Sequence, residues 1–490
     1  MQINGMKDAV GCISKPFVCS WRVEDAQGKH ARSCTVEILC DEEIVYRRKG
    51  ALNALGEELE FSPRPHEAYT VRVSVTDDAG DRGSGECVFI AGKENEPWRA
   101  KWIGMQAGDS FHPFFRKQFY IGKKPSRAQL CIAGLGLFVA FLNGKRVGDD
   151  RLAPFINDYE SGIQCCVYEI ADLLAENSEN EFNVMLGNGW YKGRLGFDGQ
   201  GQRTDREFQL IAELHFPKGE YPTIGSDTSW KYRKSCVQFS DIYDGEERDD
   251  TADLGEWRPA CEREAQHALC SRYSLPLCEQ ERLPVQQLIV TPRGEHVLDF
   301  GQNFAGYVEI NAPLARGQKV TLEFGEILQE GCFYRDNYRT ARSRYVYTSD
   351  GQNKPIVPLF TFFGFRYVKV SGMDALKKEN FTGIALYSKM RRTGYLETSD
   401  TRIDRLYENS VWGMRSNFLD MPTDCPQRDE RLGWTGDAQV FAPTASFHMD
   451  TKAFYAKFLR DLGADAARHA GAVALFLPRM SPLTASVWGG

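Results

Sequence analysis

The sequence predicts a multidomain protein in which three β-sandwich or jelly-roll domains are followed by the beginning of an α-helical domain. Up to Tyr387, apolar and polar residues alternate in short runs separated by turns, which is the pattern of β-strands. After Tyr387 the apolar residues take on helical spacing. With 490 residues, 42% of them apolar, the chain has the length of roughly three to four domains.

The first region, residues 1–96, reads as a β-sandwich of about 90 residues. Its clearest strands are the alternating runs 34–39, 69–75 and 87–90. The polar segment 92–97, Gly-Lys-Glu-Asn-Glu-Pro, is typical of a linker to the next domain.

The second region, residues 97–280, reads as another β domain. An apolar run over 137–142 precedes Asn143-Gly144, whose tolerance of positive φ predicts a two-residue hairpin turn. Further along, the glycine-rich loop 187–193 contains Trp190 and Tyr191. These rings could be exposed for stacking on a sugar, but aromatic packing beneath the loop is the favoured interpretation.

The third region, residues 281–387, predicts one more sandwich, because strands such as 320–324, 345–348 and 365–370 follow one another without intervening helices.

The fourth region, residues 388–490, predicts at least two helices. Thr401 and Asp404 form a candidate capping box for the first. Its expected apolar stripe is Ile403, Leu406, Tyr407, Val411, Met414 and Phe418. The second helix is expected after a cap at Asp450 and to end near Gly463, with Phe454, Phe458, Leu459 and Leu462 on one face. We expect the chain to stop within this domain.

Composition argues against several classes of protein. The net charge is −7 and the basic residues are dispersed, so nucleic acid is a poor candidate partner. Apolar runs are far shorter than the roughly 18 residues of a membrane span. The first twenty residues contain no signal-peptide apolar region, which favours a cytoplasmic location.

The 14 cysteines follow no CxxC spacing and many lie in strand-like runs, so we interpret them as reduced, buried thiols. The adjacent Cys165 and Cys166 should project to opposite faces of a strand. The eight histidines show neither HExxH nor Cys/His spacing, so no metal site is expected.

The densest ionisable segment is residues 424–437, with four acids and two arginines in fourteen residues. Pro422 and Pro426 prevent a continuous helix, so the segment should form a loop between two helices. Charged residues alternate with Cys425, Leu432 and Trp434, which indicates partly buried carboxylates with separated pKa values. A glycosidase needs one neutral carboxylic acid and further groups that hold sugar hydroxyls. From composition alone, a structural salt-bridge loop is favoured over an active site.

Longer motifs connect this loop to a known family. The string Met421-Pro-Thr-Asp-Cys-Pro-Gln-Arg-Asp-Glu-Arg-Leu-Gly-Trp-Thr-Gly-Asp-Ala-Gln439 closely resembles the signature loop of the bacterial α-L-rhamnosidases of glycoside hydrolase family 78. Segments of the second region resemble that family's accessory jelly roll: Asn143-Gly-Lys-Arg-Val-Gly148 and Leu186-Gly-Asn-Gly-Trp-Tyr-Lys-Gly193. Segments of the third resemble its next β-sandwich: Asp299-Phe-Gly-Gln-Asn-Phe-Ala-Gly306, Gly325-Glu-Ile-Leu328 and Phe360-Thr-Phe-Phe-Gly-Phe-Arg-Tyr367. The first 95 or so residues are similar to its fibronectin-like leading domain.

The resemblance implies that the helical region begins an (α/α)6 barrel, and that the reaction is inverting hydrolysis of terminal α-L-rhamnosides with no organic cofactor. Rhamnose-containing glycosides or oligosaccharides would be the substrates. By position, Glu430 matches the family's general acid. Contacts to rhamnose are implied for Asp424, Arg428, Trp434 and Asp437. Asp429 and Arg431 are assigned to loop structure.

Two expectations concern what lies near the end of the chain. Trp488 resembles a substrate-side aromatic residue of the family. The family's general base is a Glu on a later stretch of the barrel, and no residue of this sequence can be assigned to it. The chain is therefore expected to be a fragment, weakly active or inactive alone.

Alternatives remain open at this stage. The β domains could form a non-catalytic sugar-binding scaffold, with Trp190 as its aromatic contact. Another six-hairpin glycosidase specificity is compatible with the same fold, because a fold alone does not determine the sugar. The sequence also leaves a homodimer open.

Overall fold

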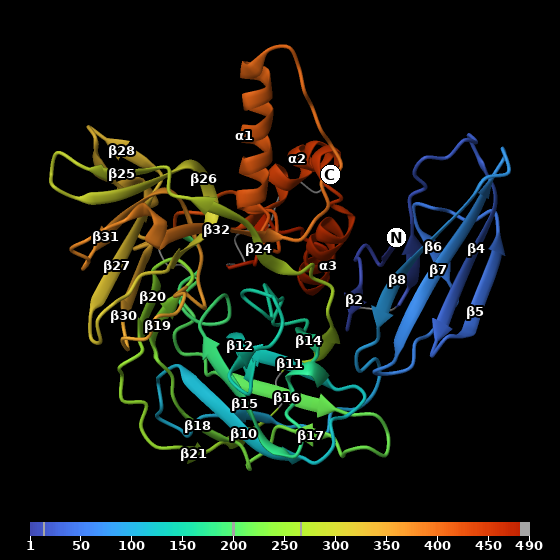
Figure 1. The fold of residues 1–490 in the computed structure, drawn as a ribbon, viewed down its shortest axis with the longest axis horizontal. Coiled ribbons are helices and arrows are strands. Elements are labelled where there is room, and N and C mark those ends of the chain that lie inside the picture. Colours follow the sequence, from blue (N-terminus) through green and yellow to red (C-terminus); the bar gives the residue numbers. More distant parts are fainter. Residues whose placement is uncertain (13–14, 198–200, 265–266, 481–490) are drawn as a thin grey trace.

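The computed structural model describes residues 1–490 except 13–14, 198–200, 265–266 and 481–490. Apart from two short strands in the helical region, its strands precede its three α-helices along the chain, as expected. Figure 1 shows the N-terminal domain in blue on one side, the second domain below, the third on the opposite side, and the helices between them.

The first domain is the expected sandwich of two sheets. Its longest strands bury alternate residues, because one face of each sheet covers the core. One sheet has the order β1 (Gln2–Ile3), β3 (Phe17–Ser20), β6 (Glu57–Leu59), and the other β2 (Ala9–Val10), β8 (Arg82–Ile90), β7 (Ala68–Asp77), β4 (Ala31–Cys40), β5 (Glu43–Gly50).

The second domain also contains two sheets. The six-stranded sheet has the order β13 (Lys145–Arg146), β12 (Leu137–Leu142), β15 (Ser178–Gly187), β10 (Pro113–Ile121), β18 (Lys231–Lys234), β21 (Arg258–Pro259). The other has the order β22 (Cys261–Arg263), β9 (Trp102–Gly104), β16 (Gln209–His215), β11 (Gln129–Leu135), β14 (Ile163–Glu169), β23 (Leu269–Ser271), with β17 (Ile224–Gly225) on β16.

Two predictions from the sequence, a hairpin turn and an aromatic loop, concern this domain. The hairpin at Asn143-Gly144 is confirmed: both residues have positive φ, 52° and 75°, and Leu142 pairs with Lys145. Trp190 and Tyr191 are only 4% and 6% exposed, so the packed interpretation of that loop is confirmed.

The third domain contains a continuous hydrogen-bonded sheet of nine strands. The 15-residue β26 pairs with three other strands, and its register shifts between Asp299 and Phe304. The order is β19 (Val237–Asp241), β20 (Gly245–Asp249), β30 (Arg344–Thr348), β27 (Lys319–Gly325), β31 (Phe363–Ser371), β26 (His296–Ile310), β32 (Phe381–Ser388), β24 (Leu277–Pro284), with β25 (Gln287–Val290) on β26 and a separate hairpin of β28 (Ile327–Gln329) and β29 (Cys332–Tyr334).

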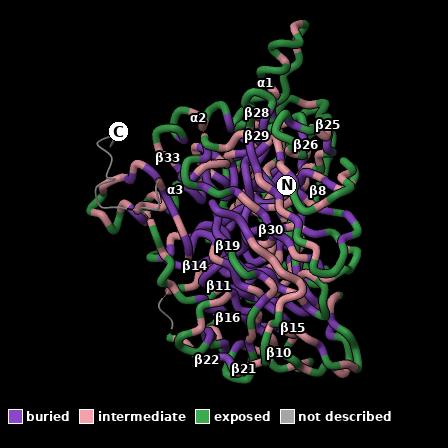
Figure 2. Tube along the Cα trace, turned by 90° about the vertical axis from the view of Figure 1, so that its left-hand side faces the viewer, coloured by how far each residue is buried: buried purple, intermediate pink, exposed green. Residues whose placement is uncertain are grey.

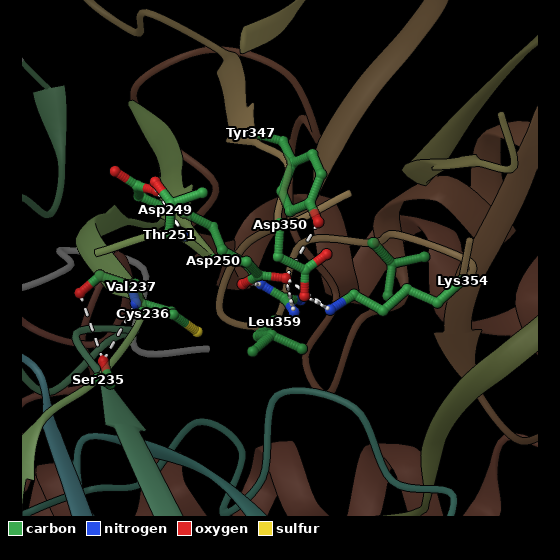
Figure 3. Close-up of polar contacts among 12 residues, drawn as sticks. Ser235, Cys236, Val237, Asp249, Asp250, Thr251, Tyr347, Asp350, Lys354 and Leu359 are labelled. Atoms are coloured by element: carbon green, nitrogen blue, oxygen red, sulfur yellow. Dashed lines mark hydrogen bonds and ion pairs between the residues drawn. The ribbon is translucent and has the colours of Figure 1, made fainter. Parts of the chain in front are cut away.

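Strands β19 and β20 come from within residues 97–280 yet join this third sheet, through the parallel pairing of β20 with β30. Figure 3 shows the ionic cluster that holds this junction. Asp250 accepts hydrogen bonds from Arg248 Nε (2.7 Å) and Tyr347 OH (3.0 Å). Lys354 Nζ lies between Asp250 (3.0 Å) and Asp350 (2.7 Å).

The helical region contains α1 (Thr401–Asn417), α2 (Thr435–His448) and α3 (Lys452–Arg468), with a short ladder of β33 (Gly433–Trp434) and β34 (Phe476–Leu477). The expected capping box is wrong: the N-cap of α1 is Asp400, whose Oδ1 accepts from Arg402 N at 2.9 Å. Thr401 already lies inside the helix, and Asp404 instead accepts a hydrogen bond from Thr398 N.

The other two helices also differ from expectation. No helix was expected over α2, which has Pro443 in its interior. Helix α3 has Thr451 as its N-cap residue and continues through Gly463 to Arg468. Asp450 lies outside it, where its side chain accepts a hydrogen bond from Gln2 (3.0 Å).

The apolar faces of the helices are only partly covered. Tyr407, Val411 and Met414 of the α1 stripe are buried as expected, but Leu406 is 65% exposed and Leu459 of α3 is 62% exposed. Figure 2 shows buried chain gathered in the centre and the far end of α1 projecting with exposed residues. Within the described ranges, no helix is both long and apolar enough to cross a membrane.

All fourteen cysteines are free thiols, and ten are buried, in agreement with the sequence interpretation. Cys165 and Cys166 lie on β14 and form no disulfide.

Candidate active site

The acidic loop lies between α1 and α2, and its own residue Arg431 anchors it through hydrogen bonds to residues outside the loop. The side chain of Arg431 is buried and its Nη1 donates to the carbonyls of Ile242 (2.7 Å) and Phe362 (2.9 Å). Tyr243 OH donates to the carbonyl of Glu430 at 2.7 Å. Arg431 therefore has the loop-structural role that the sequence analysis assigned to it.

Gly364 of β31 explains how closely the loop approaches the third sheet. A Cβ at this position would lie 2.8 Å from Pro426 Cγ and 2.9 Å from Gln427 Cβ, so any side chain would push the loop away. Tyr338 OH also donates to the Gly364 carbonyl at 2.6 Å.

Glu430 is almost buried, at 6% exposure, and donors from three side chains surround its carboxyl group. Trp434 Nε1 donates to Oε1 at 3.1 Å, and Arg428 Nη2 lies 3.1 Å from Oε2. Arg339 Nη2 also contacts Oε2. The carboxyl group is thereby held in one orientation, as a group that must deliver a proton to a bound substrate should be.

Asp424 lies beside Glu430. Its Oδ1 accepts from Leu432 N at 3.1 Å, and its Oδ2 is 3.6 Å from Arg428 Nη2. Burial, together with the negative charge of Glu430, raises the pKa of the Asp424 carboxyl above its usual range. Separated pKa values within the loop are expected from the sequence. The raised pKa found here is that of Asp424.

Asp424, Cys425 and Glu430 can each bring one ligand atom within 4.8 Å of the others, the spacing of a cation site. Burial raises the pKa of the Cys425 thiol to about 12, so the thiol stays protonated. Both carboxylates are already paired with Arg428. The arrangement fits hydrogen bonding to a sugar better than coordination of a metal ion.

The structure brings four of the six proposed site residues together: Asp424, Arg428, Glu430 and Trp434. Asp437 does not lie on the loop; it is exposed in the first turn of α2. Trp488 lies outside the described residues.

Sequence reasoning missed the residues that reach the loop from other domains. Arg339 pairs with Glu430 and, through Nε, with Oδ1 of the fully buried Asp429 at 3.2 Å. Thr340 Oγ1 also donates to Asp429. Phe197 packs near Trp434, with ring centroids 6.0 Å apart. No local spacing links these residues to the loop, since Arg339 precedes Glu430 by 91 positions.

Comparison with known proteins agrees with this architecture. Three family models match successive parts of the chain: the alpha-L-rhamnosidase N-terminal domain over residues 123–287, the bacterial alpha-L-rhamnosidase concanavalin-like domain over 289–387, and the bacterial alpha-L-rhamnosidase 6 hairpin glycosidase domain over 391–490. An alpha-L-rhamnosidase of Formosa agariphila is 34% identical over 400 residues, which is 75% of this chain and 43% of the relative.

Solved structures give the same result. The alpha-L-rhamnosidase of Aspergillus terreus has a TM-score of 0.89 at 29% identity, covering 98% of this chain and 59% of that one. The Streptomyces avermitilis alpha-L-rhamnosidase complexed with L-rhamnose has a TM-score of 0.72 at 26% identity, covering 96% and 51%.

The fold and the loop together resemble those of multidomain carbohydrate hydrolases. The chain belongs to the bacterial α-L-rhamnosidase family. It spans less than half the length of the Formosa relative.

Proposed function

We propose that this chain carries the general acid of a glycosidase that removes terminal α-L-rhamnose from glycosides by an inverting mechanism. The observation that carries the proposal is the nearly buried Glu430 carboxyl group, oriented by Trp434 and Arg428. Burial and the charge of Glu430 raise the pKa of the Asp424 carboxyl, which lies within 4.8 Å, so Asp424 can hold a proton beside Glu430. As the bond to rhamnose breaks, Glu430 would donate a proton to the glycosidic oxygen.

The rest of the loop would bind the sugar. Arg428 has 39% of its side chain exposed, and the half-buried Trp434 lies at the same surface, so both can reach a bound hydroxyl group or ring face. Asp437, which is exposed on α2, would contact rhamnose only at the edge of the proposed sugar site.

The general base is proposed to come from outside this chain. An inverting enzyme keeps its two carboxyls roughly 6.5–9.5 Å apart to admit water, and Asp424 lies within 4.8 Å of Glu430, too close for that role. The relatives are about twice as long, and exposed apolar residues on the helices, such as Leu406, Val440 and Leu459, would be covered by further helices of an (α/α)6 barrel.

The test is release of p-nitrophenol from p-nitrophenyl α-L-rhamnoside, with rhamnose binding measured by calorimetry. We expect this chain to bind rhamnose, to show little turnover, and to bind more weakly when Asp424→Asn is introduced. Turnover by this chain that Glu430→Gln abolishes would support the acid and reject the external base. Turnover that survives Glu430→Gln would show that Glu430 is not the general acid. The control is Glu397→Gln, which changes an exposed carboxylate.

The scaffold alternative loses its main support, because Trp190 is buried and its ring cannot stack on a sugar. A different glycosidase specificity would show itself as faster cleavage of another aryl glycoside in the same assay. The cytoplasmic location and the homodimer stay predictions.

A further inference from the structure

A cavity of about 280 Å³ lies between the second domain and α3. Its walls come from residues 156–160, from Arg203 and Arg206, from the polar face of α3, and from residues 477–480. An adjoining hollow of about 350 Å³ shares Arg203, Arg206, Arg479 and Met480 with it. The two arginines therefore stand where both hollows meet.

Each acidic group of the main cavity already has a cationic partner. Asp158 and Glu160 pair with Arg468 at 2.7 and 3.1 Å. Asp465 pairs with Arg479 at 2.7 Å, and Asp461 with Lys457 at 2.9 Å. Across the described part of the chain, by contrast, neither Arg203 nor Arg206 forms an ion pair with a carboxylate, and Asp205, which lines the second hollow, is exposed.

The loop that contains Trp190 and Tyr191 orients both guanidinium groups. Arg203 Nη1 donates to the Trp190 carbonyl at 2.9 Å, and Arg206 Nη1 donates to the Tyr191 carbonyl at 3.3 Å. Arg206 also lies over the rings of Tyr191 and Tyr159, at 5.0 and 5.8 Å from their centroids. A guanidinium has five N–H donors, so within the described part of the chain both groups have donors that these hydrogen bonds do not use.

Two neighbouring cations in a partly buried position are unfavourable without a counter-ion. Burial, and then the charge of Arg206, lower the pKa of Arg203 below its usual range, although the charge of Glu160 partly opposes this shift. An anion between the two groups would relieve this repulsion and accept several charge-assisted hydrogen bonds.

The cavity is also close to the proposed general acid. Leu477, which lines it, pairs with Gly433 across the β33–β34 ladder, and Trp434 in the same ladder donates to Glu430. A volume of about 280 Å³ is near the lower end of ligand pockets, roughly 300 Å³, which is the scale of a single sugar ring.

We propose that this cavity is a subsite for the carboxylate of an acidic sugar, bound by Arg203 and Arg206 with Tyr159 as an apolar wall. The proposal rests on the proposed function, since it adds an acidic sugar to the rhamnose-containing substrate. The guanidinium fork matches a carboxylate in geometry as well as charge.

The test is calorimetric titration of the full chain with sodium D-glucuronate, D-glucose and sodium sulfate at matched ionic strength. We expect binding of glucuronate and none of glucose. Equal binding of the two sugars would overturn the proposal. Sulfate binding as tight as that of glucuronate would also overturn it, by reducing the cavity to a site for inorganic anions. No rhamnose is present, so this result is independent of the assay on Glu430.

Variants locate the binding. Arg206→Gln and Arg203→Gln should each weaken glucuronate binding about ten-fold or more, since each removes a charge-assisted contact. Arg206→Lys keeps the charge but not the fork and should give an intermediate loss. Arg22→Gln, at an exposed arginine of the first domain, should change nothing. Unchanged affinity in both glutamine variants, with unfolding curves showing intact protein, would reject the site.

Discussion

A buried charged side chain connects helix α3 to other parts of the chain: Lys457. Its side chain, on α3, is 1% exposed and lies 3.2 Å from Asp420 and 2.9 Å from Asp461. Asp420 also accepts a hydrogen bond from Ile156 N at 2.8 Å. One ammonium group thus joins α3 to the start of the acidic loop and, through Asp420, to the second domain.

Replacing this lysine should be costly. Lys457→Met leaves two buried carboxylates without their shared cation, and breaking a buried ion pair in this way costs about 3–5 kcal/mol. Urea unfolding should show that loss in the free energy of unfolding. Lys452→Met, which removes only an exposed contact to the Leu55 carbonyl, should cost under about 1 kcal/mol. Equal losses in the two variants would contradict this reading of Lys457.

Residue by residue, the site was only partly accessible from the sequence. Glu430, Asp424, Arg428 and Trp434 stand within eleven positions of one another, so their chemistry shows in one short string. Arg339 was missed because its approach to Glu430 depends on how the third domain packs on the loop, which no local pattern records.

At the scale of elements, the beginning of α1 makes a direct prediction. Asp400→Ala removes the side-chain acceptor for Arg402 N and should cost about 1 kcal/mol. Thr401→Ala, at the residue that the sequence pattern favoured as the cap, should cost at most a few tenths, because Thr401 is already helical. Amide hydrogen exchange in the first turn should accelerate in the first variant alone. Faster amide exchange in Thr401→Ala would indicate that Thr401 is the N-cap after all.

The elements that were predicted carry a strong local signal. The Asn143-Gly144 turn needs positive φ at both residues, and the α1 stripe repeats with helical period. Helix α2 was not predicted because Gly436 and Pro443 are poor helix formers and its buried residues, Ala438, Ala445 and His448, form no long apolar stripe. Ala438 and Ala445 nevertheless pack into two neighbouring hydrophobic cores, and such packing can override a weak local preference.

At the scale of the whole molecule, the helices are built onto the β domains. Met414, Phe418, Met449 and Phe454 of the helical region belong to the same core as the first sandwich, with Phe418 and Phe454 stacked at 4.5 Å. Gly187 of the second domain packs against Phe360 of the third so closely that a Cβ would lie 2.2 Å from its ring. The sequence could indicate each domain, but these contacts between domains follow from three-dimensional packing.

The junction of the second and third domains should make the stability of the whole chain depend on pH. Glu246 on β20 is fully buried, and its carboxylate accepts from the backbone N–H groups of Leu359 (2.9 Å) and Phe360 (2.8 Å). Burial raises the pKa of Glu246 from 4.5 to about 7, although those two N–H groups oppose the shift. Between these values the folded chain binds more protons than the unfolded chain, so its free energy of unfolding falls as pH rises.

The contribution of Glu246 to the free energy of unfolding should be fully present below about pH 4.5 and lost above about pH 7. The difference is on the order of 3 kcal/mol. Glu246→Gln keeps a carbonyl acceptor but cannot ionise, so its stability should fall less than that of the parent between pH 5 and pH 8. Urea unfolding at both pH values measures this. Glu247→Gln, at a neighbour paired with Arg344 near the surface, should retain the parent's pH dependence. If Glu246→Gln also retained the parent's pH dependence, the carboxyl group of Glu246 would have to be ionised in the folded protein at pH 5. Its burial opposes that ionisation, because the charged form would lose its hydration.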